Sequence, residues 1–347
     1  MNRRFAEAVI AVFREADRGT HVRQFARLGV RDWRRGSHWL DASGLALYCR
    51  HRVASSCLEE CVPAEILNAL DQRLEDNKQR IVELFRKFEA INNAFQKRGV
   101  RYANLKGFTL IPDYCPDPSL RCQFDRDFII FYSELGLCQS ILEGFWIRRH
   151  RETHGNVVEF KAGSRQVPSI SDVDMFLAQA DHLLRHLKSE WTRISCLVEF
   201  RTFVNARTAD TKFWQDVRNQ TATNAEDALP VGVAVSLATQ AFGNFGPPEL
   251  LGWSIEAVPK SMRLWLNRYG KTVLWSDFPR IKLYLLLDGE SSNGGNVRKI
   301  IVGTLLPCTV HLGLLIPTGA DRSALSSRRY GSHSSGCGAT SLKAHAM

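Results

Sequence analysis

The residues whose types and spacing could perform chemistry lie in one stretch, residues 104–130, which reads NLKGFTLIPDYCPDPSLRCQFDRDFII. Two aspartates, Asp125 and Asp127, precede the apolar run FIIF. Alternate residues of a strand point to the same face, so an Asp-x-Asp pair on a strand can direct both carboxylates to one ion. Hard cations such as Mg²⁺ or Mn²⁺ bind carboxylate oxygens and keep positions open for phosphates. The sequence therefore predicts a metal site at Asp125 and Asp127.

Four further residues could complete such a site. Lys106 and Gly107 follow a short segment with strand character, and we interpret them as a turn whose lysine charge and main-chain amides hold phosphate oxygens. Arg121 supplies another positive charge next to the same segment. Glu159, on the next predicted strand, is the best-placed third carboxylate, as a metal ligand or a base. In a two-metal site one ion activates the attacking hydroxyl and the other clamps a triphosphate.

The two aspartates also have a simpler interpretation, in which they face solvent on an edge strand or pair with Arg121 and Arg126. An isolated Asp-x-Asp pair usually has no more than that role. Here the pair follows a Lys-Gly turn and a proline-rich connector and precedes a buried strand, and this context favours the metal site.

The elements that must position these residues follow from the periodicity. Apolar residues recur every three or four positions between Pro63 and Lys97, which predicts one long helix ending at Gly99. We expect strands near residues 100–105, 124–131 and 156–161 and a helix over 135–142. Two or three short helices precede Pro63. A Ser171-x-x-Asp174 capping sequence opens further helices, expected at 172–188, 191–206, 211–219 and 256–268.

These elements divide the chain into four regions. The first is an N-terminal helical region, and an α/β core follows it. A second helical region comes next, and the chain ends in an irregular segment with a disordered tail rich in serine and glycine. The expected boundaries are 1–98, 99–168, 169–290 and 291–347.

Composition limits the class of protein. The chain has 347 residues, of which 44% are hydrophobic, so a sizeable core can form. A net charge of +10 suits polyanionic partners such as nucleoside triphosphates. The nine cysteines are scattered singly, and no export signal precedes them, so we expect a cytoplasmic protein with no membrane partner. The uncharged stretch at 300–316 is broken by glycine and proline and fits buried strands better than a membrane span.

The motif in residues 104–130 also resembles a known family, an uncharacterised nucleotidyltransferase family of the polymerase-beta-like superfamily. Its members carry a Lys-Gly turn, a Tyr-Pro-Asp-Pro-like loop, an arginine and a strand bearing Asp-x-Asp. The matching elements here are LKG at 105–107, Tyr114 with PDP at 116–118, LR at 120–121 and DRD at 125–127. The resemblance covers roughly residues 25–285.

The resemblance implies an α+β fold, with a small mixed nucleotidyltransferase-type sheet flanked by N-terminal and C-terminal helical regions. It also implies transfer of a nucleoside monophosphate from a triphosphate such as ATP to a hydroxyl acceptor, with release of pyrophosphate. Asp125, Asp127 and Glu159 would then be the catalytic metal ligands, and Lys106, Gly107 and Arg121 would bind the nucleotide. The acceptor could be a small molecule, a peptide or RNA.

Two departures from the family pattern keep an alternative open. Arg126 stands between the aspartates where the family has an apolar residue, and Glu159 is followed by Phe160 and Lys161 where the family commonly has His-Trp. The alternative is a catalytically degenerate member of the fold that binds a ligand or a partner. The remaining candidates favour structural roles: His182 and His186 lack the glutamate of a zinc-protease motif, and Cys196 has no paired base.

Overall fold

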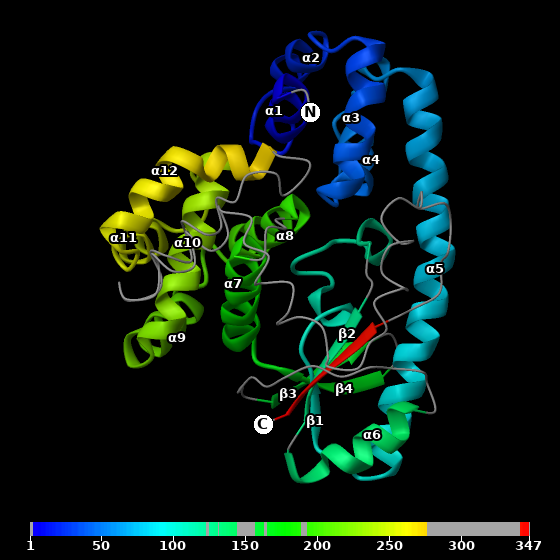
Figure 1. The fold of residues 1–347 in the computed structure, drawn as a ribbon, viewed down its shortest axis with the longest axis vertical. Coiled ribbons are helices and arrows are strands. Elements are labelled where there is room, and N and C mark those ends of the chain that lie inside the picture. The colour runs from blue at the N-terminus through cyan, green and yellow to red at the C-terminus, as the bar shows by residue number, and fades with distance from the viewer. Residues whose placement is uncertain are drawn as a thin grey trace, which may run out of the picture.

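The computed structural model describes residues 3–122, 125–130, 132–143, 157–162, 165–188, 193–275 and 341–346. In these residues many helices surround one small mixed sheet (Figure 1). The predicted fold class, α+β with helical regions on both sides of a small sheet, is confirmed.

The segment before Pro63 contains four α-helices where the sequence suggested two or three. Their boundaries follow local signals: the Asp17 side chain accepts a hydrogen bond from the Thr20 main-chain N–H, and Gly44 adopts a positive φ of 72°. Phe5 makes edge-to-face contacts with Trp33 and Trp39, which are both fully buried. The helices are α1 (Arg3–Ala11), α2 (Arg18–Phe25), α3 (Val30–Ala42) and α4 (Ala46–Ser55).

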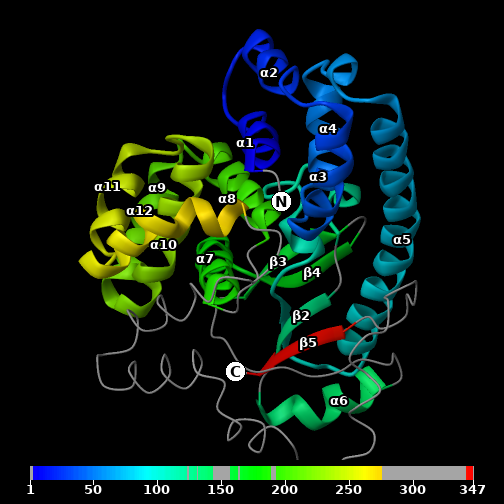
Figure 2. The ribbon, with the colours of Figure 1, turned by 45° about the horizontal axis from the view of Figure 1, so that its top comes forward.

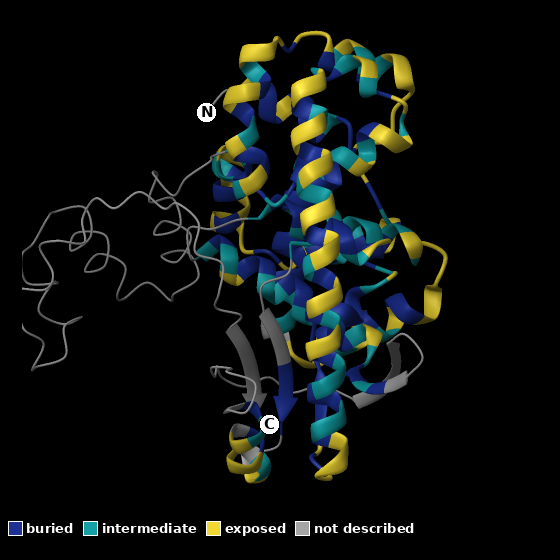
Figure 3. Ribbon diagram, turned by 90° about the vertical axis from the view of Figure 1, so that its right-hand side faces the viewer, coloured by how far each residue is buried: buried dark blue, intermediate teal, exposed yellow. Residues whose placement is uncertain are grey.

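The long helix predicted from the apolar period is present as α5 (Ala64–Lys97). Pro63 precedes its first turn, and Gly99 has the positive φ of 64° that commonly ends a helix. One face carries buried residues from Ile66 to Phe95, and exposed residues line the outer face (Figure 3). The helix spans the length of the molecule and supports one side of the sheet (Figure 1).

The sheet has the strand order β3-β4-β1-β2-β5. β1 pairs antiparallel with β2 and parallel with β4, while β3 is antiparallel to β4 and β5 is parallel to β2. Three strands lie where the sequence predicted them. The strands are β1 (Tyr102–Asn104), β2 (Asp125–Ile130), β3 (Val157–Ala162), β4 (Arg165–Ile170) and β5 (Ser341–Ala346).

Two strands were not predicted. β4 contains Pro168, and proline inside a short polar run reads as a loop because it cannot donate to the ladder. The carbonyl of Pro168 is nevertheless used, since it accepts a hydrogen bond of 2.7 Å from the Asn104 side chain. β5 lies in the segment that was expected to be irregular or disordered, so that expectation is wrong for residues 341–346.

Helices cover both faces of the sheet (Figures 1 and 2). Phe128 and Ile130 of β2 pack with Phe95 of α5 and with residues of α6 (Leu135–Glu143). Ile129, between them, belongs to the larger core on the opposite face. Because both faces of β2 are buried, its residues after Asp127 are apolar without alternation.

The second helical region begins at the predicted capping box. The Ser171 hydroxyl donates to the Asp174 carboxylate at 2.6 Å and accepts from the Asp174 main-chain N–H at 3.2 Å. α11 was not predicted, although Pro248 in its first turn is a usual helix start. The helices are α7 (Asp172–Lys188), α8 (Ile194–Ala206), α9 (Thr211–Thr223), α10 (Ala225–Phe242), α11 (Pro248–Glu256) and α12 (Lys260–Trp275).

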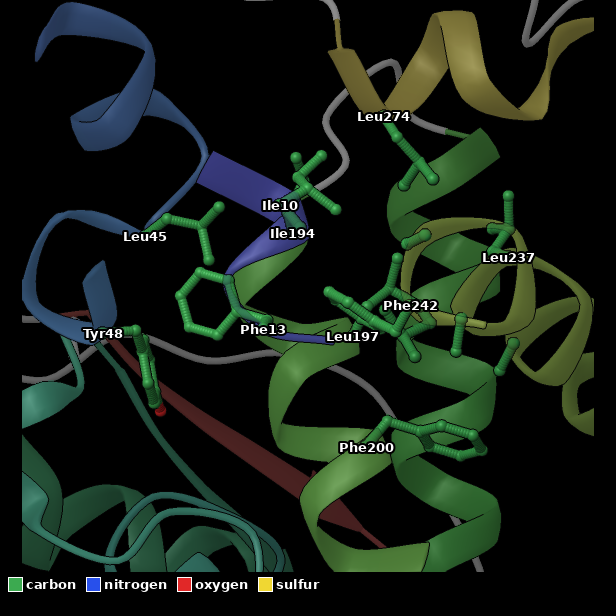
Figure 4. Close-up of a cluster of buried hydrophobic side chains, with 14 of the residues drawn as sticks. Ile10, Phe13, Leu45, Tyr48, Ile194, Leu197, Phe200, Leu237, Phe242 and Leu274 are labelled. Atoms are coloured by element: carbon green, nitrogen blue, oxygen red, sulfur yellow. The ribbon is translucent and has the colours of Figure 1, made fainter. Parts of the chain in front are cut away.

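The largest core joins the two helical regions. Ile10 and Phe13 near the N-terminus lie beside Leu197 of α8 and Phe242 of α10 in Figure 4. Within the described ranges, no helix has the length and apolarity that crossing a bilayer requires. The uncharged stretch at 300–316 lies outside the described residues.

Candidate functional site

The two predicted metal ligands lie at the start of β2. Asp125, Asp127 and Ile129 are alternate residues of β2, so they belong to the same face of the strand. Ile129 packs in the larger core on that face. The two aspartates therefore belong to the strand face opposite α5. Arg126, by the same alternation, belongs to the face of Phe128 and Ile130. The side chains of 125–127 lie outside the described part of the structure, so the metal site itself stays a prediction.

The register of the sheet brings the Lys106–Gly107 turn next to these aspartates. Asn104 pairs with Phe128, and continuing the antiparallel register by one residue sets Leu105 opposite Asp127. The turn therefore emerges from β1 beside the first residues of β2. A phosphate held by the turn and a cation held by the aspartates would be neighbours.

The turn has a fixed shape. Gly107 has φ 89° and ψ −117°, a conformation that residues with a Cβ atom rarely adopt. The 3₁₀ helix η2 (Phe108–Leu110) follows, and Phe108 contacts Phe85 and Phe88 of α5. Lys106 is buried, with 8% of its surface exposed, and its charge contributes to lowering the pKa of His182. Lys106 thus lies between the sheet and α7.

Glu159 does not lie near the two aspartates. It is on β3, opposite Pro168 of β4, and both β4 and β1 separate β3 from β2. Three spacings between neighbouring strands amount to roughly 14 Å, which exceeds the reach of two carboxylates that share one ion. A role for Glu159 as third ligand or base stays a prediction, and this distance disfavours it.

Arg121 takes part in a buried ion pair that the sequence did not reveal. Its Nε donates to Oε1 of Glu199 on α8 at 3.0 Å, and the Tyr48 hydroxyl of α4 donates to the same oxygen at 2.7 Å. The exposed fractions of the two charged side chains are 15% and 3%. Burial lowers the pKa of Arg121, but the Glu199 charge, the hydrogen bond to Glu199 and smaller contributions from Tyr48 and Cys196 together outweigh it and leave the pKa above its ordinary value. Arg121 is therefore a permanent cation held in place by α8.

The segment that leads into β2 is also held from α5. The Asn77 side-chain amide donates to the main-chain carbonyls of Ser119 and Arg121, at 2.7 and 3.1 Å. Two helices thus fix the approach to β2, one through the Arg121 side chain and one through its backbone. Sequence reasoning missed Glu199, although an acid inside the apolar run ISCLVEF is a usual sign of a buried partner.

Two cysteines near this ion pair are not nucleophiles at neutral pH. Burial raises the pKa of the Cys115 thiol and of the Cys196 thiol to about 11 each. Both therefore stay protonated, and thiolate chemistry requires the deprotonated form. The interpretation of Cys196 as a structural thiol agrees with this pKa.

The rings of His182 and His186 contact each other on α7. Their Nε2 atoms lie 3.0 Å apart, so one ring donates and the other accepts. Burial lowers the pKa of His182 well below its ordinary value, and the charges of Lys106, His186, Arg121 and Arg185 lower it further. Among the described residues, no group of three or more His, Cys, Asp or Glu side chains could hold a metal ion. The histidine pair therefore fits the structural role that the sequence favoured.

This buried histidine predicts acid sensitivity. Above pH 6.5 His182 is neutral in both the folded and the unfolded protein. Below pH 6.5 the unfolded chain binds a proton at this residue and the folded protein does not. The free energy of unfolding therefore decreases as the pH is lowered. The loss approaches about 1.4 kcal/mol for each pH unit below 6.5. Urea unfolding at pH 7.5 and 5.5 measures it, and His182→Gln should lessen the difference. An unchanged difference in this variant would contradict the assignment.

Residues 30–154 match the model of a family described as uncharacterised nucleotidyltransferase. The match covers α3 to α6, with the Lys106–Gly107 turn and both aspartates, and it confirms the resemblance predicted from this motif. It is shorter than the resemblance over residues 25–285, and Glu159 and His182 lie outside it. No curated protein and no solved structure matches the chain.

Proposed function

Because residues 30–154 match the uncharacterised nucleotidyltransferase family, we propose that the protein transfers a nucleoside monophosphate from a triphosphate to a hydroxyl acceptor. The observation that carries the proposal is the register between β1 and β2, which sets the Lys106–Gly107 turn beside Asp125 and Asp127. A turn suited to phosphates and a pair of acids suited to a divalent cation are thereby adjacent.

In the proposed reaction the acceptor oxygen bonds to the α-phosphorus, and the bond to the bridging oxygen of the departing pyrophosphate breaks. The acceptor proton leaves to a base or to solvent. A bound Mg²⁺ or Mn²⁺ would neutralise the triphosphate and favour the deprotonated acceptor. Asp125 and Asp127, on one face of β2, fit such an ion by the chemistry of their carboxylates.

The remaining residues would position the nucleotide. The main-chain amides after Gly107 would donate to phosphate oxygens, and the fixed backbone of that turn would hold them in place before the substrate arrives. Lys106 would place its charge on the same phosphates. Arg121, held by Glu199, would contribute to the positive field without having to move. Glu159 enters no step of this proposal.

Metal-dependent nucleotide binding tests the proposal directly. Isothermal titration with ATP, GTP, CTP and UTP, each with and without Mg²⁺, should show binding of at least one triphosphate that weakens strongly when the metal is omitted. A protein that binds none of the four in the presence of Mg²⁺ or Mn²⁺ would not have the proposed activity.

One observation supports the alternative of a degenerate, binding-only protein. Arg126 lies two residues before Phe128 on β2, and Phe128 and Ile130 are both fully buried, whereas the resembled family has an apolar residue at the position of Arg126. The two functions differ in product: the enzyme releases pyrophosphate from a bound triphosphate in the presence of an acceptor, and the binding protein does not. A coupled pyrophosphate assay on the sample that binds nucleotide distinguishes them.

A further inference from the structure

The outer side of α12 carries a concentration of positive charge. This helix contains two lysines and two arginines and no acidic residue, and all four basic side chains are exposed. With 3.6 residues per turn, their positions fall within an arc of about 140° and along about 17 Å of the helix axis. The helix lies on the opposite side of the molecule from α5 (Figures 1 and 2). The four residues that form this basic face of α12 are Lys260, Arg263, Arg268 and Lys271.

Packing on α10 determines which side of α12 meets the solvent. The Gln240 side-chain amide of α10 donates to the main-chain carbonyl of Leu266 at 3.2 Å. A Cβ atom at Gly270 would lie 2.6 Å from Oε1 of the same Gln240 side chain, so the two helices approach closely there. Leu274 lies among the core side chains in Figure 4. The apolar side of α12 is therefore fixed in the core, and the basic face stays outward.

The basic face is not neutralised by acids of the described residues. None of its four side chains makes an ion pair with any of them. On α9, by contrast, Lys212 pairs with Asp216 at 2.6 Å. Glu256, which lies four residues before Lys260, is exposed and forms no such pair within the described ranges. A face that gathers like charges without local compensation suits a partner that brings the opposite charge.

The exposed apolar surface of α12 is too small for a lipid bilayer or a docked protein. Leu264, with an exposed fraction of 62%, is the one large apolar side chain that this helix presents to solvent. A helix that lies on a membrane buries its apolar face in lipid, but the apolar face of α12 is packed in the core. The centre of a protein interface is mainly apolar and poor in charged residues. A partner recognised by its negative charges alone is therefore favoured.

We propose that the basic face of α12 binds the phosphate backbone of a nucleic-acid duplex, at a surface separate from the candidate site. A duplex carries one negative charge for about every 1.7 Å of its axis, so the length of the face meets on the order of ten phosphates. Lysine and arginine contact phosphate oxygens without reading the bases. Trp265 is buried and Tyr269 is half-buried, so bases have no exposed ring to stack on, as single strands require. The binding is independent of sequence and of the proposed transferase reaction.

Fluorescence anisotropy on the full chain, without nucleotide or Mg²⁺, tests the proposal with a labelled RNA duplex. The affinity should fall as NaCl is raised, with a slope of log K against log [NaCl] of about −3 to −4, because four phosphate contacts contribute roughly −0.9 each. A DNA duplex of the same sequence should bind with similar affinity, since only the backbone is contacted. A protein that binds neither duplex at low salt does not have the proposed surface.

Glutamine substitutions in the basic face locate the binding. Glutamine has nearly the helix propensity of lysine and arginine, so α12 should keep its structure. The variant with all four substitutions should bind the duplex at least about tenfold more weakly, and its salt slope should approach zero. The pair Arg263→Gln with Arg268→Gln should remove about half of the slope, and it provides the same test if the fourfold variant melts at a lower temperature. Parent-like slopes in both variants would refute the proposal.

A matched control removes four charges elsewhere. Its substitutions are at exposed arginines of other elements that make no ion pair with a described residue, and it should keep the parent affinity: Arg27→Gln, Arg86→Gln, Arg98→Gln and Arg218→Gln. An equal loss in this control would mean that net charge alone, and not α12, attracts the duplex. Vesicles that contain phosphatidylserine test the rival partner. Tighter binding to these vesicles than to the duplex, lost in Leu264→Gln, would make the face a membrane surface and overturn the proposal.

Discussion

Asparagine at position 125 or 127 is expected to lower Mg²⁺-dependent triphosphate binding and any nucleotidyl transfer by roughly 100- to 1000-fold, equivalent to about 3–4 kcal/mol. Each substitution removes one negative charge and keeps the size of the side chain. The two residues share one face of β2, so loss of either leaves a single carboxylate for the cation. Titration with MgATP and a pyrophosphate assay measure the effect.

A control variant separates this effect from a general loss of charge. Asp216 lies on α9 and pairs with Lys212 at the surface, where an ion pair contributes little. Asp216→Asn makes the same chemical change and should leave nucleotide binding and melting temperature unchanged. Parent-like MgATP binding in both the Asp125 and the Asp127 variant would refute the metal site. A lowered melting temperature in either would instead point to a structural role.

The sequence was most informative where a local rule determines structure. The apolar period between Pro63 and Lys97 predicted α5 to within a residue, and the Ser171–Asp174 capping box marked the start of α7. Alternation along the chain was also enough to assign Asp125 and Asp127 to one face of β2. Each of these signals lies within one continuous segment of the chain and does not depend on which distant segment packs against it.

Long-range pairing was not predictable in the same way. β4 was missed because Pro168 suggests a loop, and the strand forms only against β1 and β3. Glu159 followed the aspartates in sequence, which made it a natural third ligand, yet the strand order separates it from β2 by two strands. A pocket beside Thr109 likewise draws its walls from segments around residues 109–114, 169–175 and 203. No local pattern indicates that these segments meet.

Glu199 is the residue whose replacement should destabilise the fold most. Its carboxylate accepts hydrogen bonds from Arg121 and from the Tyr48 hydroxyl, and the side chain is almost fully buried. Glu199→Leu would remove the acid that pairs with the Arg121 cation in the described part of the chain and the carboxylate acceptor of the Tyr48 hydroxyl. Breaking a buried pair by removing one partner costs about 3–5 kcal/mol. We expect a fall in melting temperature of roughly 5–15 °C.

A series of variants tests whether this loss comes from the unpaired charge. Glu199→Gln keeps an acceptor for both donors and should cost less than Glu199→Leu. The double variant Arg121→Met with Glu199→Leu removes both charges and should recover most of the stability, because an apolar pair of similar volume often replaces a buried ion pair without loss. Thermal and urea unfolding of the parent, the two single variants and the double variant shows whether the losses at the two sites are coupled. If the double variant is no more stable than Glu199→Leu alone, the Arg121 charge is not the cause, and α8 is held by Glu199 through some other contact.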